Sequence, residues 1–419
     1  MVTMNRQSLN FSVDVLVVGG GPAGLIAATE LSKYDCKICV IDSMPTVGRK
    51  FLMAGKSGLN ITTSKSEFLK EYCESEQWIT PIIKKFGPEE IMNFCQSLGQ
   101  KVVFGSSGKV FPESMKTSPL LRTWLAYLKM SGVIFKTSSR WVDFSCSEAF
   151  LRSGNLSNVV QFNLENYFIN SRATLLALGG ASWPRLGSDG KWYSILQQYL
   201  DNRKISLVPF RAANMGVNIC WSSQMMKFEG KPVKQIAIKV NGKSKKGEFV
   251  VTSSGFEGGV IYKFSTMQSG KLDSFELDLL PDVPLFEVCR KLSGSRRKLT
   301  MTNFLRKSLG LTGVKFGLLR EFGYPFPNSS IELAKIIKNL HVKIDGTYSI
   351  EQAISTKGGV GKEAVNSNLM LNDLPGVFCA GEMLDWTAPT GGYLLTGCFS
   401  TGSHAGKSVA KYLNLKLLS

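Results

Sequence analysis

The stretch from Val15 to Ala28, VLVVGGGPAGLIAA, constrains the fold of this chain more than any other. A valine-rich run enters a glycine turn, and an alanine-rich helical pattern leaves it. Gly19, Gly21 and Gly24 have the G-x-G-x-x-G spacing of a dinucleotide site. There the first glycine makes the tight turn, the second lets the backbone approach a pyrophosphate, and the third lets the helix pack closely on the strand. The pyrophosphate lies at the helix N-terminus, where free N–H groups favour negative charge, so Pro22 and Ala23 are expected contacts too.

An acidic residue ends the next predicted strand. A second buried-strand pattern, from Lys37 to Ile41, leads into Asp42, which lies 18 residues after Gly24. This is close to the spacing expected for a carboxylate that accepts hydrogen bonds from ribose hydroxyls. An ordinary strand-turn-helix without a nucleotide is the alternative, and the acid favours the dinucleotide site.

The chain of 419 residues is too long for one compact core. From about residue 191, short β-rich runs alternate with turns such as Asn241-Gly242, and from residue 283 the pattern becomes helical. We therefore expect an α/β cofactor-binding domain at residues 1–190 that resumes at 341–419. A β-rich, barrel-like subdomain at 191–282 and a helical subdomain at 283–340 would be inserted into it.

Three later segments also indicate a cofactor. The loop from Met44 to Thr62 is rich in glycine and directly follows the predicted ribose-binding strand. The apolar run from Ala173 runs into glycines at Gly179, as the first strand does. Near the end, Pro389–Tyr393 leads into a helical pattern over 394–411, which makes a second glycine-led helix start suited to an electron-rich group.

Taken in order along nearly the whole chain, these motifs resemble a bacterial family of NAD(P)/FAD-dependent oxidoreductases. The family has YhiN-like, BaiN-like (bile-acid-reductase) and aminoacetone oxidase-like members. The motifs that carry the resemblance are Gly19–Gly24, Gly48-Arg49-Lys50, Gly58-Leu59-Asn60, Ala177–Gly180, Gly381-Glu382 and Pro389–Tyr393. The resemblance implies a Rossmann-like FAD-binding domain of the two-dinucleotide-binding type, interrupted by β-barrel-like and helical subdomains.

The resemblance also implies FAD rather than NAD at the first glycine turn, with Asp42 on the adenosine ribose. It implies that Glu382 accompanies the ribityl and pyrophosphate region, and that a helix starting at Tyr393 faces the flavin pyrimidine. The remaining implied FAD contacts are Arg49, Lys50, Gly58, Asn60, Ala177, Gly179, Gly381, Gly391 and Gly392. Many relatives carry G-R-C-N where this chain has Ser57-Gly58-Leu59-Asn60, which indicates a separate subgroup.

The formal net charge is +18, and residues 191–340 carry 24 Lys or Arg against 11 Asp or Glu. Such a surface can attract nucleic acid or anionic lipid. Because no aromatic residue is interleaved with Lys291, Arg296, Arg297 and Lys298, we expect solvated lysines and no nucleic-acid partner. The sequence has no signal peptide and no run long enough to span a membrane, so we expect a cytoplasmic protein.

The nine cysteines and two histidines do not predict a metal site. Cys36 and Cys39 form a C-x-x-C pair at the entry to the second strand, but no second pair or nearby histidine completes a zinc site. Buried free thiols are the expected state of these cysteines.

The sequence thus predicts an FAD-dependent oxidoreductase with a small-molecule substrate and hydride transfer through flavin N5, with NADH or NADPH as a transient reductant. The alternatives are an oxidase of a small amine, a flavoprotein that modifies nucleic acid, and a non-catalytic FAD-binding protein. Tyr393, Asp385 and Glu382 are candidate acids or bases by position only, so the catalytic residues stay unassigned.

Overall fold

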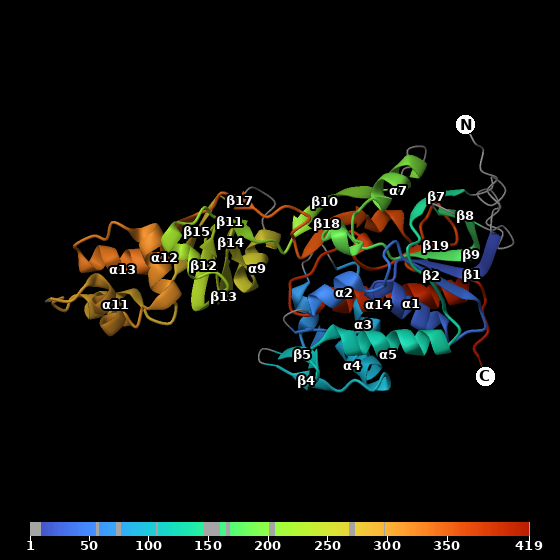
Figure 1. Cartoon of the computed structure of the whole chain (residues 1–419), viewed down its shortest axis with the longest axis horizontal. Coiled ribbons are helices and arrows are strands. Elements are labelled where there is room, and N and C mark those ends of the chain that lie inside the picture. The colour runs from blue at the N-terminus through green and yellow to red at the C-terminus, as the bar shows by residue number, and fades with distance from the viewer. Residues whose placement is uncertain are drawn as a thin grey trace. The chain divides into compact units, whose positions relative to one another are not determined.

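The computed structural model describes residues 10–55, 58–72, 77–105, 108–145, 160–164, 168–200, 206–267, 273–296 and 298–418. It divides into two compact units (Figure 1). Unit 1 comprises Met1–Ala212 and Ser355–Ser419, and unit 2 comprises Ala213–Ile354.

The main sheet of unit 1 is built around β1 (Asn10–Val18). Its parallel neighbours are β2 (Ile38–Ile41) and β9 (Phe168–Leu176). Parallel strands at the next positions are β6 (Ile134–Lys136), beside β2, and β19 (Val377–Cys379), beside β9. Every residue of β2 is buried, as expected for a parallel strand covered on both faces.

Strand β9 has two different partners beside β1. Its first half pairs antiparallel with β8 (Val160–Leu164), which is followed by β7 (Trp141–Ser145). Its second half, from Thr174 to Leu176, pairs parallel with β19. The carboxyl ends of β1, β2, β9 and β19 therefore lie at one edge of the sheet, although β19 follows β9 by about 200 residues of sequence.

Two helices pack against each other beside this sheet. They are α1 (Pro22–Leu31) and α14 (Tyr393–Tyr412), the latter close to the predicted range. Glycine makes the close approach possible, because a Cβ at Gly402 would lie 2.2 Å from the Ala23 carbonyl oxygen. The buried Trp124 of α5 (Thr117–Met130) stacks on Phe399 of α14, so one face of α5 packs into this core.

The smaller elements of unit 1 surround this core. A three-stranded antiparallel sheet consists, in order, of β3 (Thr62–Thr63), β5 (Lys109–Pro112) and β4 (Val102–Phe104). A short 3-10 helix follows at Phe68–Glu71. The other elements are α2 (Arg49–Ala54), α3 (Thr80–Lys85), α4 (Pro88–Ser97), η4 (Pro184–Leu186), α7 (Trp192–Leu200), β10 (Leu207–Ala213), β18 (Ser355–Val360), η5 (Lys362–Ala364) and η6 (Gly381–Met383).

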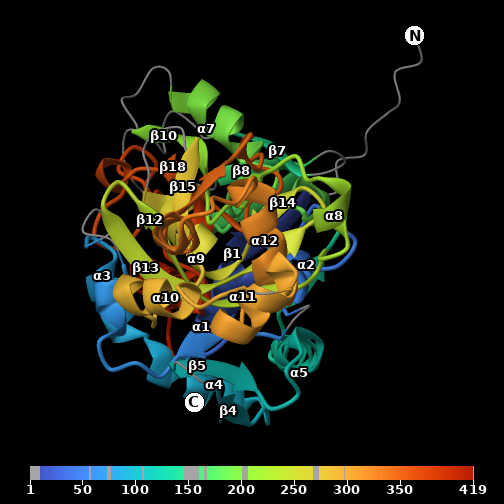
Figure 2. The ribbon, with the colours of Figure 1, turned by 90° about the vertical axis from the view of Figure 1, so that its left-hand side faces the viewer.

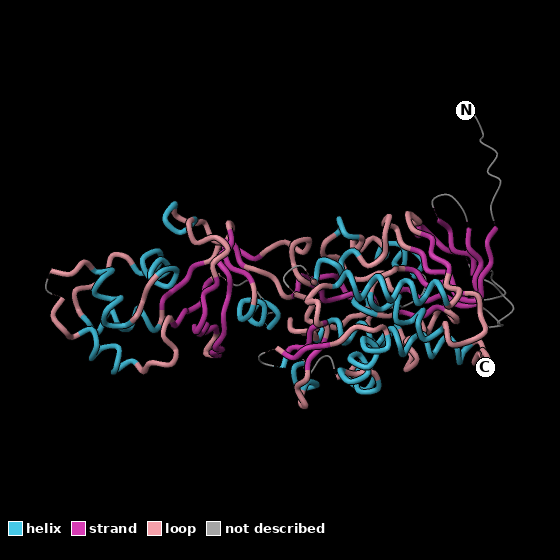
Figure 3. Tube along the Cα trace, turned by 60° about the horizontal axis from the view of Figure 1, so that its bottom comes forward, coloured by secondary structure: helices cyan, strands magenta, loops and turns pink. Residues whose placement is uncertain are grey.

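Unit 2 is one antiparallel sheet with helices on both sides. Helices α11, α12 and α13 lie on one side of the sheet and α9 on the other (Figures 1 and 3). The strands, in sheet order, are β16 (Leu340–Lys343), β15 (Ser274–Asp278), β12 (Pro232–Val240), β13 (Lys243–Thr252), β14 (Gly255–Glu257), β11 (Val217–Asn218) and β17 (Gly346–Thr347). The helices are α8 (Ser223–Met226), α9 (Gly259–Met267), α10 (Leu285–Leu292), α11 (Met301–Leu309), α12 (Gly313–Gly323) and α13 (Ser330–Lys338).

The unit boundaries differ from the predicted ones. Residues 191–212 belong to unit 1, because Trp192 of α7 donates to the Gly179 carbonyl and β10 pairs with β18. Residues 341–354 belong to unit 2, because β16 and β17 form the two edges of its sheet. The predicted β-rich and helical subdomains also share one hydrophobic core, which includes Leu277 and Leu305. Turn and helix patterns mark the elements but do not show which elements pair.

No helix among the described residues is both long and apolar enough to cross a membrane.

Candidate cofactor site

The three glycines of the first turn have three different surroundings. Gly19 has φ +109°, and a Cβ there would lie 2.2 Å from the Ala177 carbonyl oxygen. A Cβ at Gly24 would lie 2.0 Å from the Gly19 carbonyl oxygen. These two glycines allow the tight turn and the close helix, as expected. A Cβ at Gly21, the residue before Pro22, would have no neighbour within 4 Å, so this side of the turn is open.

Asp42 is tied to the glycine turn. Its carboxylate accepts hydrogen bonds from the Gly20 N–H (3.0 Å) and from the Met44 N–H (2.8 Å). Burial raises the pKa of Asp42, opposed by these two N–H groups and by the nearby Arg49 charge. The carboxylate keeps further lone pairs with which it can accept from a sugar hydroxyl. Its expected contact with the adenosine ribose stays a prediction.

The end of β9 lies beside the same turn. The Ala177 N–H donates to the Val18 carbonyl (2.8 Å), which places the β9 end next to the β1 end. Gly179 follows with φ +71°, and its carbonyl accepts from Trp192. The end of β9 therefore lies near the first glycine turn. Contact of Ala177 and Gly179 with a cofactor stays a prediction.

The C-terminal glycine motif meets the first helix. Gly381 has φ +81°, and a Cβ there would lie 2.8 Å from the Cβ of Ala23. The Gly381 N–H donates to the Thr401 hydroxyl of α14 (2.9 Å). The start of α1 and Gly381, two residues after β19, thus lie against each other.

Lys50 and Glu382 bind each other. The Lys50 ammonium donates to Glu382 Oε2 (2.7 Å) and to the Ser182 hydroxyl (2.7 Å). The other carboxylate oxygen of Glu382 accepts from the Thr356 N–H (2.9 Å). The Glu382 side chain is 7% exposed. The sequence motifs indicated Lys50 and Glu382 as cofactor contacts. They did not indicate that these two residues bind each other, or that Ser182 and Thr356 also bind them. Their separation of 332 positions hides the pairing.

The second glycine turn begins α14. Gly391 and Gly392 have φ +114° and +92°, and a Cβ at Gly392 would lie 2.7 Å from the Thr62 carbonyl oxygen. Tyr393 is the first helical residue, and its carbonyl accepts from the Tyr72 hydroxyl (2.8 Å). The first N–H groups of a helix have no partner within it, so this end can receive an electron-rich group.

Asn60 lies beside this helix start. A Cβ at Gly391 would be 3.9 Å from Asn60 Nδ2. Both polar atoms of the Asn60 carboxamide are buried without a hydrogen-bond partner, and the Thr387 hydroxyl is in the same state. Buried polar groups in native proteins are almost always satisfied. A bound group is therefore expected to satisfy Asn60.

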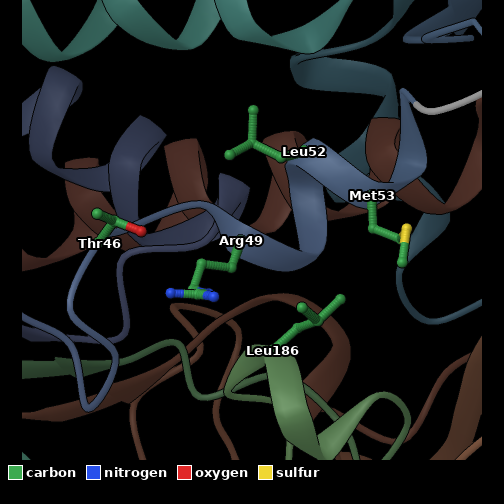
Figure 4. Close-up of a pocket in the computed structure, with 5 residues that line it drawn as sticks. All are labelled: Thr46, Arg49, Leu52, Met53 and Leu186. Atoms are coloured by element: carbon green, nitrogen blue, oxygen red, sulfur yellow. The ribbon is translucent and has the colours of Figure 1, made fainter.

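A hollow opens between α2 and the turn at Pro184–Leu186 (Figure 4). Arg49 is the only cation among its described lining residues, and the other four are Thr46, Leu52, Met53 and Leu186. The adjacent cations Arg49 and Lys50 thus have different surroundings, because Lys50 binds Glu382. A largely apolar wall with one guanidinium suits a ligand that is part planar and part anionic.

The residues present fit a flavin dinucleotide. The open side of Gly21 lies at a helix N-terminus that suits a pyrophosphate, and the unpartnered Asn60 lies at a second helix N-terminus. The three candidate acids or bases are not free groups. Glu382 binds Lys50, Asp385 accepts from the Gly358 N–H (3.0 Å), and Tyr393 is buried. Their geometry does not single out a catalytic residue.

Comparison with known proteins gives the same picture. Residues 13–408 match the model of the HI0933-like protein Rossmann domain. The chain is 23% identical to 3-dehydro-bile acid delta(4,6)-reductase of Clostridium scindens, covering 94% of this chain and 98% of that protein. It is 22% identical to ribosomal RNA dihydrouridine synthase of Haemophilus influenzae, again covering 94% and 98%.

The fold has a solved counterpart. The open conformation of a flavocytochrome c3 fumarate reductase superposes with a TM-score of 0.50 and 15% identity, covering 96% of this chain and 79% of that one. This likeness concerns the fold alone. With the family match over residues 13–408, the chain belongs to the HI0933-like Rossmann family of FAD-dependent oxidoreductases.

Proposed function

We propose that this protein is a reductase that adds hydrogen across a carbon–carbon double bond conjugated to a carbonyl group. The observation that supports FAD dependence is the pair of helix N-termini in unit 1, one beside the open Gly21 and one beside the unpartnered Asn60. The names of both relatives fit this reaction, since a 3-oxo-delta(4) steroid and a uracil ring each contain such a bond.

The reaction balances with a nicotinamide reductant. NADH or NADPH supplies a hydride and solvent supplies a proton, and the double bond becomes a single bond with two new C–H bonds. FAD, when bound, supplies the hydride relay between the two reactants. On this proposal Gly21, Pro22 and Ala23 hold its pyrophosphate and Asp42 its adenosine ribose.

Anaerobic reduction of the purified protein tests this function. We expect a bound flavin that mass spectrometry identifies as FAD and that NADH or NADPH bleaches. We expect 2-cyclohexen-1-one, a small conjugated ketone, to restore the yellow colour without oxygen. A flavin reoxidised only by oxygen, with hydrogen peroxide formed, would favour the amine oxidase alternative. A protein that binds no FAD would refute the proposal.

An RNA substrate is a second candidate, because unit 2 carries a basic surface. Between residues 285 and 309 Glu287 is the only acid against seven Lys or Arg. Helices α10 and α11 lie side by side (Figure 2). We call the exposed cations of these two helices and of the segment between them the basic α10–α11 surface: Arg290, Lys291, Arg296, Lys298, Arg306 and Lys307.

An exposed aromatic residue lies just before these cations, outside the stretch from Lys291 to Lys298 in which the sequence has none. Phe286 is 73% exposed and lies four residues before Arg290, on the same side of α10. Cations beside an exposed aromatic ring suit a base and its phosphate. One relative's name specifies ribosomal RNA.

Salt-dependent binding tests this candidate. Anisotropy of a labelled ribosomal RNA fragment should report binding that weakens steeply with salt. The double variant Arg306→Gln/Lys307→Gln should reduce the slope of log affinity against log salt by about 2. Lys129→Gln, an exposed change on α5, is the control. Equal slopes for all three proteins would favour the small-molecule substrate.

A further inference from the structure

The hollow between α2 and η4 is an open space with one wall supplied by a helix face. Its volume is about 460 Å³, a size typical of small-molecule sites (Figure 4). Arg49, Leu52 and Met53 have the i, i+3 and i+4 spacing that places them together on one face of α2. Phe51 is buried in the core, where its ring meets Phe399 edge-on, so the helix that carries this face is fixed.

The opposite wall is held by the residue that follows Arg49. The Lys50 ammonium donates to the hydroxyls of Ser182 (2.7 Å) and Ser188 (3.3 Å), which flank η4 on its two sides. Leu186, the last residue of η4, lines the hollow together with the α2 residues. Because Lys50 belongs to α2, its hydrogen bonds join the two walls to each other.

The Arg49 side chain is a half-buried cation in this hollow. Its guanidinium has no ion-pair or hydrogen-bond partner within the part of the chain that the structure describes. Burial raises the pKa of Asp42 and the nearby Arg49 charge opposes this rise, but the two carboxylate oxygens of Asp42 accept from the Gly20 and Met44 N–H groups. A guanidinium matches the two oxygens of an anionic group in one plane. Arg49 therefore suits an oxyanion that the described chain does not supply.

The lining favours an apolar carboxylate over a nucleotide. Among the described lining residues, Thr46 and Arg49 alone are polar. An adenine ring and a ribose carry several polar groups, and leaving such groups without partners is costly. The side chains of Leu52, Met53 and Leu186 suit a saturated hydrocarbon body, to which a flexible methionine can adapt.

We propose that the hollow binds a monocarboxylate with an aliphatic body. The carboxylate pairs with the Arg49 guanidinium, and the body lies against Leu52, Met53 and Leu186. On the proposed function this ligand is the substrate, and the hollow binds the part of it that does not react; the identity of the ligand as substrate rests on that function. The role differs from the FAD contact that the family resemblance implies for Arg49.

Direct binding to the FAD-loaded protein tests the site. Isothermal titration calorimetry compares cyclohexanebutanoate with cyclohexanebutanamide, which has the same body and no charge. We expect the wild-type protein to bind the carboxylate at least about tenfold more tightly, since hydrogen bonds between charged groups are the stronger ones. Arg49→Gln should abolish this preference and keep its FAD, and Leu52→Ser should weaken both ligands about equally. Arg185→Gln is the matched control, because it removes an exposed cation of η4 that does not line the hollow.

A matched pair of conjugated ketones tests the link to the reaction. A cyclohexenone that carries a butanoate tail should have a KM at least about tenfold below that of its primary amide. Arg49→Gln should raise the KM of the carboxylate to that of the amide and lower kcat far less. An interaction that is equally strong in the ground state and the transition state affects KM alone.

The outcomes are distinguishable. Equal affinities of the wild-type protein for carboxylate and amide would overturn the assignment of the hollow, and this comparison needs no variant to fold. Loss of FAD from folded Arg49→Gln, or release of FAD from the wild-type protein by cyclohexanebutanoate, would also overturn it and return Arg49 to the cofactor. A protein that prefers the carboxylate through Arg49 but reduces neither ketone would uphold the site and overturn the proposed function.

Discussion

Lys50 Nζ lies 2.7 Å from Glu382 Oε2 and joins two segments that are 332 positions apart. The carboxylate is 7% exposed and the ammonium side chain 24% exposed. The pair links the start of α2 to η6, the short helix that follows β19, where two predicted cofactor motifs meet. Its first role in this structure is therefore to hold the site together.

Removing one partner should cost more than removing both. Lys50→Met leaves a buried, uncompensated carboxylate, which typically costs about 3–5 kcal/mol; the partial exposure of Lys50 favours the lower end. The double variant Lys50→Met/Glu382→Gln should recover part of that loss. Urea unfolding of the three proteins measures the difference. A double variant less stable than Lys50→Met would contradict this account.

Two glycines of the first turn should respond differently to valine. Gly21 has extended backbone angles and open space, so Gly21→Val should fold normally and lose FAD, because the new side chain occupies the expected pyrophosphate position. Gly24→Val should fail to fold, since its Cβ would overlap the Gly19 carbonyl. Gly294→Val, in an open loop of unit 2, is the matched control. Flavin absorbance per folded protein gives the readout, and stoichiometric FAD in Gly21→Val would disprove the placement.

Gly392 should tolerate no side chain. It combines φ +92° with a Cβ position 2.7 Å from the Thr62 backbone, so Gly392→Ala should lose roughly 2–3 kcal/mol from strain and overlap together. Gly99→Ala has φ +72° but open space, and should lose only about 1 kcal/mol. Thermal unfolding of both variants separates overlap from strain. Equal losses of stability in the two variants would mean that the backbone at Thr62 moves to make room for the new Cβ.

The thiols should differ sharply in reactivity. Cys220 is exposed, whereas burial raises the pKa of Cys39, Cys95 and Cys398 to about 12. Raised pKa values keep these three thiols protonated, and a thiol is a poor nucleophile. Alkylation of the folded protein at pH 8, mapped by mass spectrometry, should therefore modify Cys220 well before the other three. Rapid native modification of Cys398 would show that α14 opens at its start.

The sequence alone determined the local geometry of this protein. The spacing of Gly19, Gly21 and Gly24 specified the turn after β1, because a turn with positive φ and a closely packed helix requires glycine at fixed offsets. The continuous apolar run of β2 indicated a strand buried on both faces. The glycines before Tyr393 marked the start of α14. Each of these constraints acts over a few consecutive residues, so it can be recognised in the sequence.

Only the tertiary structure decided which distant groups meet. Nothing near Lys50 in the sequence indicates Glu382 as its partner, and nothing near Asn60 indicates that its carboxamide is buried beside Gly391 without a partner. The placement of α7 in unit 1 and of β16 in unit 2 depended likewise on pairing across long separations. Strand pairing and burial depend on contacts among all the packed elements. The pattern of residues along one segment therefore does not predict them.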